Sequence, residues 1–162
     1  MPRTSSPLLR VLMPLATLTL LVTGCSPVVD VEPAAEAANP VCAEVMVALP
    51  DEVSAHELRQ TDSQATAAWG EPSKLIVRCG VTPPGPTTDR CVTVNGIDWV
   101  LTEGDPAWTA TTYGRDPAVE AVFDPNEIPS STVLVSLGGA VDAVPQTNKC
   151  LSVTKDQTIP DK

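Results

Sequence analysis

The stretch CVTVNGIDWV, Cys91–Val100, contains the clearest structural signal in this chain. Asn95 and Gly96 tolerate positive φ and stand between two short runs rich in β-branched residues, as a two-residue type I′ hairpin requires. The register of such a hairpin sorts the flanking side chains into two faces: Val92, Val94, Ile97 and Trp99 on one, and Cys91, Thr93, Asp98 and Val100 on the other. The sequence therefore predicts an antiparallel hairpin with one strongly apolar face.

Runs of the same kind, separated by turn residues, predict further strands on both sides of this hairpin. The complete set of predicted strands is His56–Gln60, Gln64–Trp69, Leu75–Val81, Cys91–Val94, Ile97–Leu101, Trp108–Tyr113 and Ala118–Phe123. In the third of these, alternation places Leu75, Val77 and Cys79 on one face and Ile76 and Arg78 on the other. The segment between Pro50 and His56 is predicted to be an acidic turn.

A short amphipathic helix is predicted before the strands. Asn39-Pro40 is typical of a helix cap followed by a first-turn proline, and Cys42, Val45, Met46 and Leu49 recur at the helical spacing i, i+3, i+4, i+7. Pro50 would stop this helix.

A second helix is predicted after Pro129, with Ser130 or Ser131 as its cap and Pro145 at its end. Its apolar positions are Val133, Leu134, Leu137, Val141 and Val144. The alternative is a strand over Val133–Leu137 that turns at Gly138-Gly139. The expected fold class is α+β: a small antiparallel sheet of about five to seven strands, packed with two short helices and stabilised by two disulfides.

The N-terminus has the parts of a bacterial lipoprotein signal peptide. Arg3 and Arg10 precede an apolar run that ends in Leu21-Val22-Thr23-Gly24-Cys25. The run is about 12 residues long, too short to span a bilayer, which takes roughly 20. We therefore expect residues 1–24 to be cleaved and Cys25 to carry a diacylglyceryl group and acyl chains such as palmitate, which would hold the protein on the membrane.

The rest of the chain divides into three parts. Residues 25–39 mix proline, alanine and carboxylates without periodicity and predict a flexible tether. Residues 40–153 predict one globular domain, and residues 154–162 a loose polar tail. Removing residues 1–24 leaves 8 basic against 20 acidic residues, a formal charge of −12. This charge argues against nucleic acid as a partner.

Four cysteines remain besides Cys25: Cys42, Cys79, Cys91 and Cys150. Their spacing does not fit a zinc or thioredoxin-like site, and an even number favours structural disulfides in an oxidising compartment. Four cysteines allow three pairings. If the first helix covers the apolar face of Leu75–Val81, Cys42–Cys79 is the natural bridge and leaves Cys91–Cys150.

The chain lacks the common catalytic, cofactor-binding and metal-binding motifs, and we assign no residue to those roles. His56, the single histidine, lies in a polar stretch and is expected to be solvated. Arg78, Asp98 and Arg115 are the candidates for a polar site: Arg78 and Asp98 could pair or line a cleft, or form salt bridges at the sheet surface. Three tryptophans, Trp69, Trp99 and Trp108, could stack on a sugar or lipid, but core packing explains them more simply.

The strings VCAEVMVALP, AAWGEPSKLIVRCGV, CVTVNGIDWV and TTYGRDPAVEAV, in this order behind a lipobox, resemble an actinobacterial family known as domain of unknown function 3515. The most specific pieces are Trp69-Gly70, Arg78-Cys79-Gly80, Asp98-Trp99 and Gly114-Arg115. The resemblance implies a small secreted or lipid-anchored envelope protein without an assigned activity. Family members often keep the counterparts of Cys42 and Cys79, which is similar to the pairing given above.

These observations lead to two hypotheses about function. The first is a non-enzymatic interaction or ligand-binding module, lipid-anchored through Cys25 on the extracytoplasmic side of the cell membrane, with an envelope protein, lipid or glycan as its partner. The second is an enzyme that modifies envelope polymers or lipids through carboxylates such as Asp98, assisted by Arg78 or Arg115.

Overall fold

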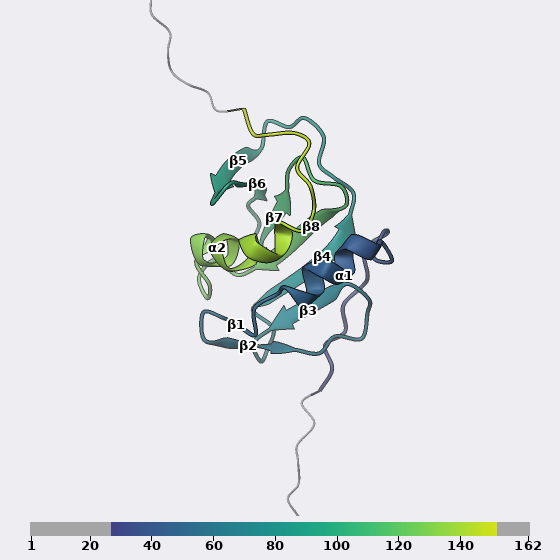
Figure 1. The fold of residues 1–162 in the computed structure, drawn as a ribbon. Helices are drawn as coiled ribbons and strands as arrows, with labels where there is room; N and C mark the ends of the chain where they lie inside the picture. The colour runs from purple at the N-terminus through teal and green to yellow at the C-terminus, as the bar shows by residue number, and fades with distance from the viewer. Residues whose placement is uncertain (1–26, 152–162) are drawn as a thin grey trace, which may run out of the picture.

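The computed structural model describes residues 27–151 as one antiparallel sheet with two helices on its inner face (Figure 1). The order of the strands across the sheet is β1-β2-β3-β4-β8-β7-β6-β5. Their bounds are β1 Glu52–Val53, β2 His56–Arg59, β3 Thr66–Trp69, β4 Leu75–Val81, β5 Arg90–Val94, β6 Ile97–Thr102, β7 Trp108–Thr112 and β8 Ala118–Phe123. The helices are α1 Pro40–Val47 and α2 Ser130–Val141. The predicted α+β class is confirmed.

All seven predicted strands are present, with ends shifted by no more than two residues. The hairpin at Asn95-Gly96 has the predicted register, with Val94 opposite Ile97 and Val92 opposite Trp99. Strand β1 is an addition, because the predicted acidic turn contains two residues that pair with β2. Its turn consists of Ser54 and Ala55, which both adopt positive φ and are not among the residues that normally mark such a turn.

The core lies between the inner face of the sheet and the two helices. Trp69, Leu75 and Trp99 are completely buried on the sheet side, and Val45 and Leu137 on the helix side. Burial of large apolar side chains is the main force that holds the two layers together, at about 25 cal/mol per Å² of apolar surface removed from water. Core packing is thus confirmed for Trp69 and Trp99, while Trp108 is half-buried against the core.

Helix α1 begins as predicted: the side chain of Asn39 accepts a hydrogen bond from the backbone N–H of Val41, and Pro40 occupies the first turn. The helix covers β4, and Cys42 forms a disulfide with Cys79 across this contact. The pairing follows from two apolar faces that meet, because each cysteine lies on the buried side of its own element.

Helix α2 confirms the helical alternative for residues 133–137. Ser130 and Ser131 do not cap it, since Pro129 holds the cap position and no side chain accepts a hydrogen bond there. A Cβ on Gly138 would meet Ile97 at 3.8 Å, an ordinary van der Waals contact, so the packing of α2 against β6 does not require glycine at this position. After α2 the chain crosses the outer face of β6, and Cys150 forms the second disulfide with Cys91.

Residues 27–39, expected to be part of a free tether, run along the domain instead; we call this segment the strap. The backbone N–H of Val29 donates to the carbonyl of Gln60 at 3.0 Å, and the N–H of Asp62 donates to the carbonyl of Val29 at 3.1 Å. A carboxylate oxygen of Asp62 also accepts from the N–H of Val31 at 3.0 Å. These bonds join the strap to the end of β2.

A second attachment of the strap depends on Gly80. The N–H of Glu36 donates to the carbonyl of Gly80 at 3.0 Å, and a Cβ built on Gly80 would lie 2.4 Å from the carbonyl carbon of Glu36. The buried strap side chains are small: Val31, Ala34 and Ala37. Such residues give no periodic signal, and their partners lie far away in the sequence, so only the tertiary structure reveals the attachment.

Residues 1–24, Cys25 and the tail at 154–162 lie outside the described residues. Neither helix of the described part has the length and apolar character needed to cross a membrane.

Candidate functional site

The structure separates the three residues predicted as a polar site. Arg78 on β4 pairs with Glu120 on the neighbouring strand β8, with Nε and Nη2 both donating to the same carboxylate oxygen at 3.0 and 2.5 Å. This is a cross-strand ion pair on the outer face of the sheet, partly open to water. Arg78 therefore does not pair with Asp98, and its positive charge is balanced by Glu120 within the sheet.

Asp98 is buried, with only 3% of its surface exposed. One carboxylate oxygen accepts a hydrogen bond from the Thr93 hydroxyl at 2.5 Å. The other accepts from the side-chain amide of Gln146 at 2.9 Å and from the backbone N–H of Cys150 at 2.8 Å. A buried carboxylate needs such donors, and here they fix the segment after α2 onto the hairpin.

Arg115 is also buried and serves the same segment. Its Nη1 donates to the backbone carbonyls of Val141 and Val144, at the end of α2, and its Nη2 lies 3.5 Å from the carboxylate of Asp142. The unsatisfied carbonyls at a helix end are natural acceptors for a guanidinium. Arg115 therefore positions the end of α2, and the three predicted residues do not form one site.

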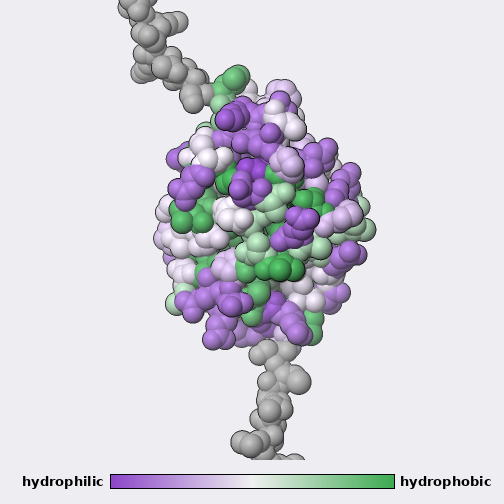
Figure 2. Space-filling model, in the orientation of Figure 1, coloured by the Kyte–Doolittle hydropathy of each residue, from purple (hydrophilic) through white to green (hydrophobic). Residues whose placement is uncertain are grey.

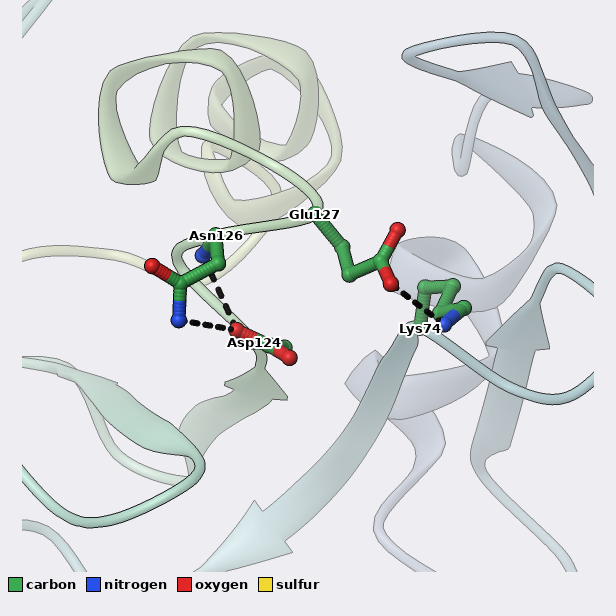
Figure 3. A network of polar contacts seen from close by, with 4 residues as sticks. All are labelled: Lys74, Asp124, Asn126 and Glu127. Carbon is green, nitrogen blue, oxygen red and sulfur yellow. Dashed lines mark hydrogen bonds and ion pairs between the residues drawn. The ribbon is translucent and has the colours of Figure 1, made fainter.

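The polar contacts between β4 and the loop before α2 are structural as well (Figure 3). Lys74 Nζ lies 2.8 Å from a carboxylate oxygen of Glu127, while Asp124 accepts from the backbone N–H and side-chain amide of Asn126 at 2.9 and 3.0 Å. The second pair is a turn in which an aspartate bonds the backbone two residues on. These contacts hold the loop that connects β8 to α2.

A cavity of about 520 Å³ lies where the strap meets β2; we call it the strap pocket. Its lining comes from the strap, the turn between β1 and β2, strand β2 and the end of β3: Pro27, Ala55, His56, Glu57, Leu58, Arg59, Gln60, Gly70 and Glu71. No sequence motif indicated this pocket, because its parts come together only through tertiary contacts.

Arg59 joins the walls of the strap pocket. Its Nη1 donates to the carbonyl of Gly70 at 3.0 Å and its Nη2 to the carbonyl of Pro27 at 2.7 Å, and Nη2 also lies 2.6 Å from the carboxylate of Glu71. Arg59 Nε is buried and has no hydrogen-bond partner among the described residues. This side chain therefore holds the first described residue of the strap against the end of β3.

The turn between β1 and β2 forms the rim of the strap pocket. Ser54 and Ala55 both have positive φ, a conformation that costs a non-glycine residue about 1 kcal/mol or more and is often found at functional sites. His56 is half-buried and not freely solvated, since a Cβ on Gly70 would lie 3.1 Å from its Nδ1. Among the residues of the pocket, the sequence singled out His56 as the single histidine and Gly70 as part of the family resemblance.

Two further hollows are present. A smaller groove of about 260 Å³ between α1 and β2 shares Leu58, Arg59 and Gln60 with the strap pocket, and its further lining includes Met46, Leu49 and Ala67; we call it the α1 groove. Figure 2 shows hydrophobic surface over this part of the molecule, above the point where the chain enters. The third, of about 520 Å³, lies beside the Cys91–Cys150 disulfide and Tyr113.

Within residues 27–151, histidine, cysteine, aspartate and glutamate side chains do not gather into a group of three or more that could hold a metal ion. Asp98 lines none of the three hollows described above. The strap pocket is the place where an arginine, a histidine and two glutamates surround an accessible volume, and it is the candidate binding site.

The motifs that carry the family resemblance lie where remote segments meet. The missing side chain of Gly70 leaves room for His56, and the carbonyl of Gly70 accepts a hydrogen bond from Arg59. The missing side chain of Gly80 leaves room for the strap. The carboxylate of Asp98 binds the segment after α2. At Gly114, a Cβ would lie 2.0 Å from the carbonyl oxygen of Asn148, so a side chain there would displace that segment. These motifs thus maintain the fold.

The chain also matches a known family model. The model of a family described as "Protein of unknown function (DUF3515)" matches residues 8–150, from the predicted signal peptide through the second disulfide. No curated protein and no solved structure matches the chain. Because the match covers most of the sequence, this protein belongs to the DUF3515 family of proteins of unknown function.

Proposed function

We propose that the protein is a lipoprotein of the bacterial cell envelope. Its anchor is the lipid on Cys25, and its domain is a non-enzymatic binding module on the extracytoplasmic side of the cell membrane. The lipobox before Cys25 supports the anchor. The two disulfides support export, because they persist in oxidising compartments.

The strap pocket is the observation that carries the binding role. It combines polar groups with an accessible volume of about 520 Å³, within the range of small-ligand sites. The partner is an envelope protein, lipid or glycan that contacts this pocket. By contrast, Asp98 and Arg115 are buried and engaged by backbone groups, which suits a structural role. These contacts give no support to the alternative, an enzyme that modifies envelope polymers or lipids through Asp98.

Photocrosslinking in intact cells tests this proposal. A photoreactive amino acid replaces Glu57, which lines the strap pocket, and in a control strain it replaces Val135, an exposed residue of α2. We expect a defined adduct, identified by mass spectrometry as protein, lipid or glycan, from position 57 and none from position 135. Equal adducts at both positions, or none, would contradict a binding role for the pocket.

A cellular test addresses the enzyme alternative. Asp98→Asn keeps the size of the side chain but removes its charge, so it abolishes general acid or base catalysis at this position. If the exported variant supports the cell as well as the wild type does, catalysis by Asp98 is excluded. Loss of function at an unchanged level of folded protein would support the enzyme.

A further inference from the structure

The distance between the predicted anchor and the folded domain is very short. Cys25 precedes Pro27, the first described residue, by two positions. Two residues of extended chain span at most about 7 Å. A free tether over 25–39 would instead lift the domain roughly 20 Å or more from the membrane. The strap removes that freedom.

The strap is attached immediately after its start. Arg59 Nη2 donates to the carbonyl of Pro27 at 2.7 Å, and Val29 exchanges backbone hydrogen bonds with Gln60 and Asp62. In Figure 1 the described chain begins beside β2 and leaves at the opposite end of the molecule, near β5. The anchor thus acts on one defined end of the domain.

The surface at this end contains exposed apolar side chains. Val28 has 54% of its surface exposed and Leu58 37%, two of five large apolar side chains exposed in the described residues. Leu58 lies between the strap pocket and the α1 groove and lines both. Apolar side chains held this close to lipid gain free energy by entering the headgroup region.

We infer that the end of the domain formed by Val28, Leu58 and the mouth of the strap pocket lies on the lipid surface of the membrane that carries the anchor. This inference rests on the proposed lipid anchor and adds an orientation to it. The strap pocket then opens next to the lipid headgroups, so a ligand reaches it from the membrane surface. Strand β5 lies at the other edge of the sheet, six strand spacings from β2, a separation of roughly 29 Å along the sheet.

The negative charge of the domain opposes its contact with the membrane, so this contact depends on the strap, which keeps the domain close to the lipid. The domain is acidic, and anionic lipid repels it. Arg59 is paired with Glu71, and Glu57 adds a further negative charge at the strap pocket, so the contact depends on the apolar side chains of Val28 and Leu58 and not on an attraction between opposite charges. Raising the ionic strength should therefore leave the orientation intact.

Paramagnetic relaxation in lipid nanodiscs tests the orientation on the full lipidated chain. The protein, isotope-labelled and purified from membranes, is reconstituted in nanodiscs with and without a gadolinium-chelating headgroup lipid, and amide signals are compared. We expect the signals of Val28 and Leu58 to be lost and those of strand β5 to keep their intensity. Similar losses at both ends, or greater losses in β5, would overturn the inference.

Variants separate the contributions of strap and surface. Asp62→Ala removes the acceptor of the Val31 N–H, and we expect it to reduce the difference in signal loss between the two ends. Gln64→Ala, at a nearby exposed position, is its control. Leu58→Gln should weaken the contact, whereas Val135→Gln on α2 should not. If Asp62→Ala and Leu58→Gln both leave the difference in signal loss between the two ends unchanged, the stated mechanism is contradicted.

Mass spectrometry of the same sample separates this inference from the proposed function. If Cys25 carries no lipid, the anchor is wrong and the orientation falls with it. If Cys25 is acylated and the two ends are equally affected, the anchor stands and the orientation alone is wrong.

Discussion

The carboxylate of Asp98 accepts a hydrogen bond from the backbone N–H of Cys150 at 2.8 Å, across 52 positions of sequence. Cys150 is also joined to Cys91, two positions before Thr93, whose hydroxyl donates to Asp98. One hairpin thus holds the C-terminal part of the domain both covalently and through a buried carboxylate. Asp98, a candidate catalytic acid in the sequence, holds the C-terminal segment of the domain against this hairpin.

Asp98→Asn should therefore destabilise the domain. Asparagine has one acceptor oxygen and no charge, so it cannot accept all the hydrogen bonds that the two carboxylate oxygens of Asp98 accept, at a cost of about 1–3 kcal/mol in the free energy of unfolding. Urea unfolding followed by far-UV circular dichroism measures this loss. Asp89→Asn, at an exposed loop position, is the control; equal stability of both variants would show that the contacts of Asp98 contribute little.

Gly80→Ala should release the strap and destabilise the domain by roughly 2–4 kcal/mol. Gly80 has φ +100°, and the added Cβ would overlap the backbone at Glu36. Gly85→Ala is a matched control, because a Cβ there meets nothing within 4 Å. Thermal unfolding of the two variants gives the comparison, and a strap that stays protected from hydrogen exchange in Gly80→Ala would contradict this role.

Removing a disulfide should cost about 4 kcal/mol for either bridge in the chain-entropy model, because the closed loops span 37 and 59 positions. Cys42→Ala combined with Cys79→Ala, and Cys91→Ala combined with Cys150→Ala, measure the two bridges separately. Peptide mapping of exported protein without reduction should recover Cys42–Cys79 and Cys91–Cys150. Four free thiols would refute the oxidised state.

Acid should loosen the strap at Asp62. The backbone N–H of Val31 donates to this carboxylate and lowers its pKa below the usual value. A carboxylate whose pKa is lower in the folded state stabilises that state above its unfolded pKa of about 3.9, and this contribution is lost as the pH falls through the folded pKa. Hydrogen exchange of the Val31 amide from pH 6 down to pH 2 follows the release; in Asp62→Asn the dependence on this titration should vanish.

Cys25→Ala should abolish acylation and move the protein out of the membrane fraction, because no lipid chain then holds it. Metabolic labelling with a palmitate analogue and fractionation of cells measure both effects. Ser26→Ala, at the adjacent position, should stay on the membrane. A Cys25→Ala protein that keeps its label and its location would refute the lipobox assignment.

Features of the fold that depend on neighbouring residues were predictable. The hairpin at Asn95-Gly96, the face of β4 that carries Cys79 and the start of α1 at Asn39-Pro40 are all confirmed, because alternation, turn residues and caps act over a few positions. The cysteine pairing followed from two such faces and needed one assumption, that α1 covers β4.

The strap, strand β1 and the strap pocket had no comparable signal. Their hydrogen bonds connect Arg59 with the carbonyl of Pro27 and Glu36 with the carbonyl of Gly80, and these acceptors are backbone groups that every sequence possesses. Arg78 and Asp98 lie on strands, as predicted, but their partners, Glu120 and Cys150, come from distant segments.

Seven of the eight strands of the described residues, the two helices and the apolar faces that close the core were predictable from the sequence, because these follow from local periodicity and the burial of apolar surface. The attachment of residues 27–39 to the domain, and the polar cavity beside them, became visible in the folded structure alone. The strap is held by hydrogen bonds to backbone carbonyls and by close approaches at glycines. Both join segments that are remote in the sequence, so they form only when the chain has folded.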